Sequence, residues 1–177
     1  LTVVDEILFF RAEDDVNGDE LWKSDGTETG TVMVKEIHPT PTTGPWLLTG
    51  VNDTLFFAVD NDANGNELWK SDGTEAGTVM VKDIYPGGSS LIRYGTSFNG
   101  LLYCGADDGT HGYELWKSDG TSAGTVLVKD IIPGSGDSDP EWLADVNGTL
   151  FFSVGNELWK SDGTEAGTVL IKDIWSG

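Results

Sequence analysis

The chain lacks much of what several protein classes require. It has a single cysteine, Cys104, so it can form no disulfide within itself. No apolar run approaches the ~18 residues of a membrane-spanning helix, which argues against membrane insertion. Only two histidines, His38 and His111, are available for acid–base chemistry, and neither lies in a recurring setting.

Basic residues are scarce, because 10 Lys and Arg accompany 30 Asp and Glu and leave a net charge of −20. Only Arg11 and Arg93 lie outside a repeated pattern. The others are lysines at two recurring positions: Lys23, Lys35, Lys70, Lys82, Lys117, Lys129, Lys160 and Lys172. No basic patch remains for phosphate backbones, so nucleic acid is excluded as a partner, and so are anionic membranes. The acidity suits a cation-rich medium, a bound divalent ion, or simply solubility.

Glycine is abundant, with 24 residues, and threonine, valine and aspartate are common, which favours strands and tight turns. Hydrophobic residues make up 38% of the 177 residues, enough for the core of one ordinary domain. No signal peptide is visible and the first residue is Leu1, so we expect a mature or excised piece of something longer.

One stretch occurs four times. "NELWKSDGTEAGTV" occupies residues 66–79 and again 156–169, with near-copies at 19–32 and 113–126. Its tryptophans are spaced 47, 47 and 43 residues apart, a period that indicates a repeat architecture. The tryptophan and aspartate of each copy are Trp22, Asp25, Trp69, Asp72, Trp116, Asp119, Trp159 and Asp162. The repeats are expected at about 1–38, 39–85, 86–132 and 133–177.

Each repeat reads as four short strands. In the second they are expected at 46–51, 54–59, 67–71 and 78–84, with a polar loop at 60–66. Asn-Gly and Asp-Gly dipeptides between strands are strong hairpin signals. Four antiparallel strands per repeat predict an all-β β-propeller of four blades, either a closed ring or part of a larger propeller. A flat sandwich would explain the hairpins but not the period.

The segments "ELWKSDGTEAGTV", "NGTLFF" and "VKDI" followed by Pro-Gly resemble the ELWxxDGT repeat family of large, mostly bacterial, secreted proteins. The resemblance covers almost the whole chain. It implies propeller-like blades and an extracellular or cell-surface location, but that family has no well-defined biochemical role. The repeat length is also similar to that of the tachylectin-type five-bladed lectins.

The repeated stretch is interpreted as scaffold. Asp72 can accept hydrogen bonds from its own turn, Gly73 and Gly77 permit positive φ, and Trp69 can pack between neighbouring blades. The stretch resembles the Asp-box of sialidase-type propellers, a hairpin that serves the fold. Because every polar group appears four times, nothing marks one copy as the single asymmetric centre that catalysis needs.

Two acidic loops carry alternating oxygen ligands followed by a glycine, as an EF-hand calcium loop does. Structural calcium is one interpretation of this pattern, and a solvated acidic turn is the other. The predicted ligands are Glu13, Asp15, Asn17 and Glu20 in the first repeat and Asp60, Asp62, Asn64 and Glu67 in the second. The third repeat keeps little of this pattern, and the fourth has lost the loop.

Function is expected where the repeats differ, first at these acidic loops and second at the loops between repeats and the first strands, which carry Trp46, Tyr94 and Trp142 and the cation Arg93. Aromatics beside Asp and Asn are typical of sugar-binding grooves, but core packing explains the same aromatics. We expect a non-enzymatic, secreted or surface-displayed module for adhesion, assembly or protein interaction. A multivalent carbohydrate-binding lectin is the alternative, and a sialidase-type hydrolase, which would need an arginine cluster, is the third. Expected partners are a protein or glycan at the cell surface, with self-association through open blade faces.

Overall fold

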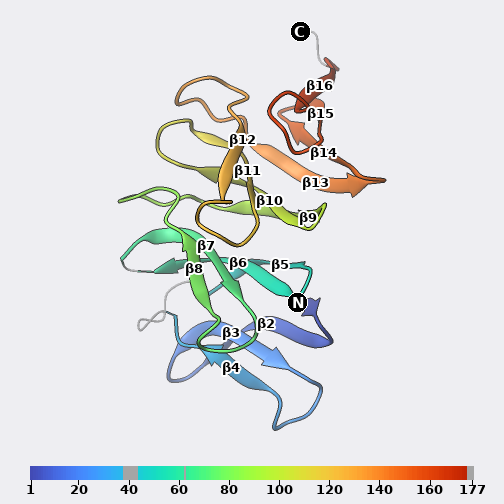
Figure 1. The fold of residues 1–177 in the computed structure, drawn as a ribbon. Coiled ribbons are helices and arrows are strands. Elements are labelled where there is room, and N and C mark those ends of the chain that lie inside the picture. Colours follow the sequence, from blue (N-terminus) through green and yellow to red (C-terminus); the bar gives the residue numbers. More distant parts are fainter. Residues whose placement is uncertain (38–43, 62, 175–177) are drawn as a thin grey trace. The chain divides into compact units, whose positions relative to one another are not determined.

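The computed structural model describes residues 1–37, 44–61 and 63–174, which form sixteen strands and no helix. The strands make four antiparallel sheets, each with its four strands in chain order (Figure 1). The predicted fold class, all-β with four four-stranded blades, is confirmed. The sheets are called blades one to four below. Among the described residues, no helix is long and apolar enough to cross a membrane.

The blades fall into two compact units, residues 1–89 and 90–177, which are described separately. Blade one holds β1 (Thr2–Val4), β2 (Ile7–Asp14), β3 (Gly18–Ser24) and β4 (Val32–Lys35). Blade two holds β5 (Trp46–Val51), β6 (Thr54–Asn61), β7 (Gly65–Ser71) and β8 (Val79–Lys82). Blade three holds β9 (Arg93–Phe98), β10 (Leu101–Asp107), β11 (Tyr113–Ser118) and β12 (Val126–Lys129). Blade four holds β13 (Pro140–Val146), β14 (Thr149–Val154), β15 (Glu157–Ser161) and β16 (Val169–Lys172).

The first hairpin of blades two to four turns at an asparagine with positive φ. The φ angles of Asn52, Asn99 and Asn147 are 51°, 50° and 53°. Asparagine tolerates this left-handed conformation better than other non-glycine residues, and the twist of such a turn matches that of the flanking strands. This turn chemistry explains why an asparagine recurs at the position.

The second hairpin of blade two is tighter than the sequence predicts. The expected loop at 60–66 is wrong at both ends, because Asp60 pairs with Asn66 and Asn61 with Gly65 inside the β6–β7 ladder. The fourth strand also ends early, at Lys82 rather than 84. There the Ile84 N–H donates to the Glu67 carboxylate (2.7 Å) instead of continuing the ladder.

Each unit has one apolar core between its two blades. In unit one, Val4, Phe9, Leu21 and Val34 of blade one pack against side chains of blade two, which are Leu55, Phe57 and Val59. In every blade, the face that carries the residues equivalent to Val4, Phe9, Leu21 and Val34 is called the front face. The opposite face, which carries the residues equivalent to Leu55, Phe57 and Val59, is called the back face. Trp69 packs on this core from the back face of blade two. The hydrophobic effect of covering these two faces is the main force that joins the blades.

Unit two repeats the arrangement with equivalent residues. The front face of blade three contributes Phe98, Tyr103, Leu115 and Val128, and the back face of blade four contributes Leu150 and Phe152. Trp159 packs on this core as Trp69 does in unit one. The expectation that the repeated tryptophan packs between neighbouring blades therefore agrees with the cores of both units.

The position of Leu21 in the front face leads to a matched stability test. Leu21 is 0% exposed, whereas Leu158, the same position of blade four, is 39% exposed. Leu21→Ala should lower the free energy of unfolding by about 2–5 kcal/mol, because it leaves a cavity in a close-packed core. Leu158→Ala should lower it by about 1 kcal/mol, since less apolar surface leaves water there. Urea unfolding in dilute solution measures both, and equal losses would contradict this account of the core.

Candidate functional site

The repeated stretch forms a turn closed by its own side chains. In blade two, Asp72 Oδ1 accepts hydrogen bonds from Thr74 N (2.8 Å) and Thr74 Oγ1 (2.7 Å). Ser71 Oγ accepts one from Gly73 N (2.9 Å), and Thr78 Oγ1 donates to Thr74 O (2.6 Å). The Thr74 bonds lower the pKa of Asp72. The carboxylate is thus bound in an Asx-type turn.

The other three copies of the turn make the same bonds. Asp25, Asp119 and Asp162 each accept from the threonine two residues on, at 2.7–2.9 Å. The serine before each aspartate bonds the threonine seven residues later at 2.7–2.8 Å. Repetition at this level of detail marks a structural element rather than a reactive centre.

The two glycines of the turn have different roles, which corrects one expectation. Gly73 has a φ of 83°, the left-handed region that favours glycine. Gly77 has no positive φ; a Cβ there would overlap the Asp72 carboxylate. Gly77 is therefore explained by the space that the Asp72 side chain occupies, not by backbone conformation. The same overlap would occur at Gly30, Gly124 and Gly167.

The repeated lysines bond the next blade. Lys23 Nζ on the front of blade one donates to the Gly73 carbonyl in the turn of blade two (2.7 Å), and Lys35 Nζ donates to the Thr78 carbonyl (2.9 Å). In unit two, Lys117 Nζ donates to the Gly163 carbonyl at 2.8 Å and Lys129 Nζ to the Glu165 carbonyl at 3.4 Å. The turns of blades two and four thus accept hydrogen bonds from the preceding blade of the same unit. The sequence analysis does not predict this role, although lysines that recur at two fixed positions in an acidic chain could have indicated it.

The repeated glutamate ties the chain between blades. Glu20 and Glu67 are buried, and their carboxylates accept hydrogen bonds from Ile37 N (3.1 Å) and Ile84 N (2.7 Å). Glu114 does the same for Ile131 N (3.0 Å) and also accepts from Ser138 Oγ (2.6 Å). Burial raises the pKa of Glu114 above its ordinary value, although these hydrogen bonds oppose the shift.

These contacts bear on the predicted calcium ligands of blade one. The Glu20 carboxylate accepts a hydrogen bond from Ile37, in the chain beyond β4. The β2–β3 loop is instead closed by Asp14, whose carboxylate accepts from Asn17 N (2.6 Å) and Asn17 Nδ2 (2.9 Å). Glu13 and Asp15 are exposed. The structure therefore does not gather Glu13, Asp15, Asn17 and Glu20 around one point.

Blade two shows the same departure. Asp60 lies within β6, and Asp62 lies outside the described residues. Asn64 Nδ2 donates to Asp83 Oδ2 (3.1 Å), and Glu67 bonds Ile84. Across 1–37, 44–61 and 63–174, no three His, Cys, Asp or Glu residues are grouped as a metal would need. Calcium binding at these loops stays a prediction.

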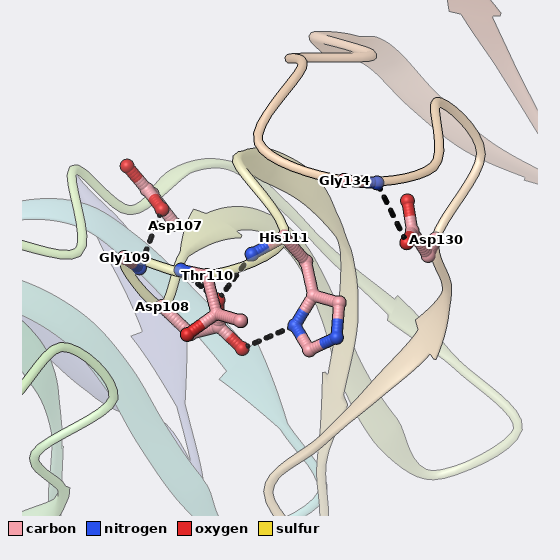
Figure 2. A network of polar contacts seen from close by, with 7 residues as sticks. All are labelled: Asp107, Asp108, Gly109, Thr110, His111, Asp130 and Gly134. Carbon is pink, nitrogen blue, oxygen red and sulfur yellow. Dashed lines mark hydrogen bonds and ion pairs between the residues drawn. The ribbon is translucent and has the colours of Figure 1, made fainter.

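The equivalent turn of blade three uses a histidine. Figure 2 shows Asp108, whose carboxylate accepts from Thr110 N (2.9 Å) and His111 N (2.8 Å) and pairs with His111 Nδ1 (2.8 Å). The Asp108 hydrogen bond raises the pKa of His111, and the nearby charges of Asp130 and Glu114 add to the rise. His111 takes the place that Asn17 and Asn64 hold in the other two loops, so it reads as a turn residue.

The raised pKa of His111 predicts a pH-dependent contribution to stability. A folded-state pKa above the unfolded value of about 6.5 stabilises the fold fully below that value, and the effect is lost as the pH rises through the folded pKa. His111→Asn gives this turn the residue found in blades one and two. In thermal unfolding, the midpoint of wild type minus that of the variant should be larger at pH 5 than at pH 8.5. A difference that does not change with pH would refute the ion pair.

One group of side chains differs from blade to blade and includes an exposed aromatic residue. Tyr94 and Trp142 occupy equivalent positions of β9 and β13, and their ring centroids are 5.9 Å apart. Tyr94 Oη donates to Glu141 Oε1 (2.8 Å), and Trp142 is 74% exposed. Both residues have a φ of 57°, as Leu47 nearly does at 61° in blade two. The recurrence of this φ in three blades, beside a register shift in each first strand, marks a bulge of the repeat, and what differs between the blades is the side chain that the bulge carries.

The remaining single residues carry no site. Cys104 is buried in β10, and burial raises the pKa of its thiol to about 12, so it stays protonated and unreactive. Arg11 pairs with Asp19 of its own hairpin. Trp46 lies in β5 at the position that Arg93 occupies in β9, where Arg93 is exposed next to Tyr94.

Comparison with known proteins adds little to this description. No family model matches the chain, and no curated protein matches it. Among solved structures, an α-L-arabinofuranosidase from Clostridium thermocellum aligns with a TM-score of 0.33 and 15% identity, covering 96% of this chain and 71% of that one. At that score and identity, the activity of that enzyme does not transfer to this chain.

Proposed function

We propose that this protein is a non-enzymatic, secreted or surface-displayed module of β-propeller blades that serves adhesion, assembly or protein interaction. One observation carries the proposal. In all four copies, the serine, aspartate and threonine side chains of the repeated stretch are bonded within their own turn. Groups bonded in this way fourfold leave no distinct nucleophile and base for a reaction.

Three features support the location in this proposal. The resemblance to the ELWxxDGT repeats implies a secreted or surface protein. A net charge of −20 suits a medium rich in cations and opposes binding to nucleic acid. The one thiol is buried in β10, so the chain does not depend on a reducing compartment.

Carbohydrate binding is the second candidate, and the Tyr94–Trp142 pair favours it. An exposed indole face offers a platform for the apolar side of a sugar ring. Glu141 lies within hydrogen-bond distance of Tyr94 and offers an acceptor for sugar hydroxyls. Arg93, the next residue before Tyr94, offers donors. An aromatic platform with a few polar groups at its edge is the usual composition of a small-ligand site.

A panel of immobilised polysaccharides and purified surface proteins tests both candidates. The chain should be retained on at least one member of the panel without releasing soluble sugar or peptide from it. Release of more sugar or peptide molecules than there are bound protein molecules would show turnover and would contradict the non-enzymatic proposal. Retention on protein surfaces that free sugars do not displace would support protein interaction.

Trp142→Ala distinguishes the carbohydrate candidate. Because the side chain is 74% exposed, the midpoint of thermal unfolding should change by no more than about 2 °C. Retention on the polysaccharide should fall by at least tenfold, since the stacking platform is lost. The control is Tyr94→Phe, which keeps the ring and removes only the hydroxyl bond to Glu141. Unchanged polysaccharide retention by Trp142→Ala would remove the aromatic pair as the site.

A further inference from the structure

Blade four lacks the end of the hairpin that the other blades share. In blade three, residues 107–113 extend the β10–β11 hairpin and end in the turn drawn in Figure 2. In blade four the β14–β15 ladder stops at the pair of Val154 with Glu157, and only Gly155 and Asn156 join the two strands. The missing residues are those that, in blade three, lie against the segment of chain entering that blade.

The shorter hairpin leaves a depression with a volume of about 420 Å³, called the blade-four depression. It is lined by Ile132 and residues 137–139 on one side and by residues 154–157 on the other. Both sides belong to unit two. The volume lies within the range of roughly 300–1,000 Å³ that small-ligand sites occupy. The depression is therefore large enough to receive a side chain of another molecule.

Blade three shows which bond the missing residues make. The Asp107 N–H donates to the carbonyl of Ser90 (2.9 Å), in the segment that enters blade three. Ser138 is the equivalent of Ser90 in the segment that enters blade four, and it lines the depression. Ser138 is 2% exposed, and no described residue donates a hydrogen bond to its carbonyl. A buried carbonyl without a donor costs free energy, so an occupant that brings an N–H group is favoured here.

The charge of the lining favours a donor that is a cation. Asp137 and Asp139 are exposed, and neither forms an ion pair with a described basic residue. Partial loss of water around its carboxylate raises the pKa of Asp139, the charges of Asp137 and Glu141 add to the rise, and Arg93 opposes it. A cation bound beside these carboxylates would favour their ionised forms and remove this cost, which a neutral donor would not do.

The apolar part of the lining suits a hydrocarbon stem. Ile132 is 43% exposed and Val154 is half-buried, and both line the depression. A lysine side chain covers such surface with its methylene groups while its ammonium group keeps polar contacts. The chain already uses this kind of bond, because the ammonium groups of Lys23 and Lys117 donate to backbone carbonyls at 2.7 and 2.8 Å. An ammonium group has three donors, enough for one carbonyl and two carboxylates.

We propose that the blade-four depression binds a lysine side chain of a partner protein. The ammonium group donates to the Ser138 carbonyl, as the Asp107 N–H does to Ser90 in blade three, and to the carboxylates of Asp137 and Asp139. The methylene stem lies against the apolar part of the lining. This inference rests on the proposed function and deepens it, because it gives the chemistry that a partner in a protein interaction must present.

An NMR titration of the whole chain, followed at each backbone amide, tests the site without the partner. The probe is Nα-acetyl-lysine methylamide at physiological salt, which screens unspecific attraction to a chain of net charge −20. It should shift the amide signals of Ser138, Gly155 and Asn156 to saturation. The same probe acetylated at Nε keeps the stem but lacks the charge, and it should bind about tenfold more weakly. Equal affinity of the two probes, or tighter binding of glucosamine, would overturn the proposal.

Two variants locate the binding in the depression. Asp139→Asn removes one carboxylate and should weaken binding of the lysine probe by about fivefold. Glu165→Gln removes the same charge from an exposed residue elsewhere in unit two and is the control, which should bind as wild type does. Replacing residues 155–156 by residues 107–113 of blade three restores the missing hairpin end and should abolish the shifts. Probe binding that neither change weakens would overturn the proposal.

Retention on immobilised surface proteins separates failure of this inference from failure of the proposed function. Where wild type is retained, the variant with the restored hairpin should be lost from the surface, and acetylation of the lysines of the immobilised protein should have the same effect. Retention that survives both changes would overturn the inference and leave protein interaction standing. A chain that binds the lysine probe but is retained by no surface protein would contradict the proposed protein interaction, and with it the partner named here.

Discussion

Two blades are joined by the apolar core between them, and an ammonium group beside that core bonds a backbone carbonyl of the following blade. Lys23 and Lys117 make this bond at 2.7 and 2.8 Å beside the two apolar cores. A carbonyl is accessible there because the turn places a glycine at positive φ, with no side chain above it. The aspartates of these turns also attract the ammonium groups, Asp72 that of Lys23 and Asp162 that of Lys117.

The other repeated residues hold that carbonyl in position. Asp72 and Thr74 fix the shape of the turn, and Gly77 leaves room for the Asp72 carboxylate. Glu67 fixes the chain that leaves β8 toward the next blade. In blades two and four the repeated stretch therefore shapes the turn that accepts a lysine, and in blades one and three it supplies that lysine. The repeated stretch is thus a joining element, and ligand binding belongs to residues that differ between blades, such as Trp142.

Much of the fold follows from the sequence, because period, alternation and turn dipeptides act locally. The Asx-type bonds of Asp72 also follow from residue type and spacing. The sequence does not show where a side chain points when its partner lies outside its own turn. The spacing of oxygen-bearing residues predicts Glu67 as a ligand in the loop before it, but the carboxylate bonds Ile84 at the other end of the strand. The pairing of Tyr94 with Trp142 joins residues 48 positions apart and depends on the bulged first strands.

The most direct test of the joint replaces single lysines by methionine, which keeps the apolar stem and removes the charge and the donors. Lys23→Met and Lys117→Met should each lower the free energy of unfolding by about 1–3 kcal/mol, the range for hydrogen bonds to charged groups. Lys160→Met, at the same motif position without a described acceptor, should change it by no more than about 0.5 kcal/mol in dilute solution. Equal effects at the three positions would contradict the account that the repeated lysine joins one blade to the next.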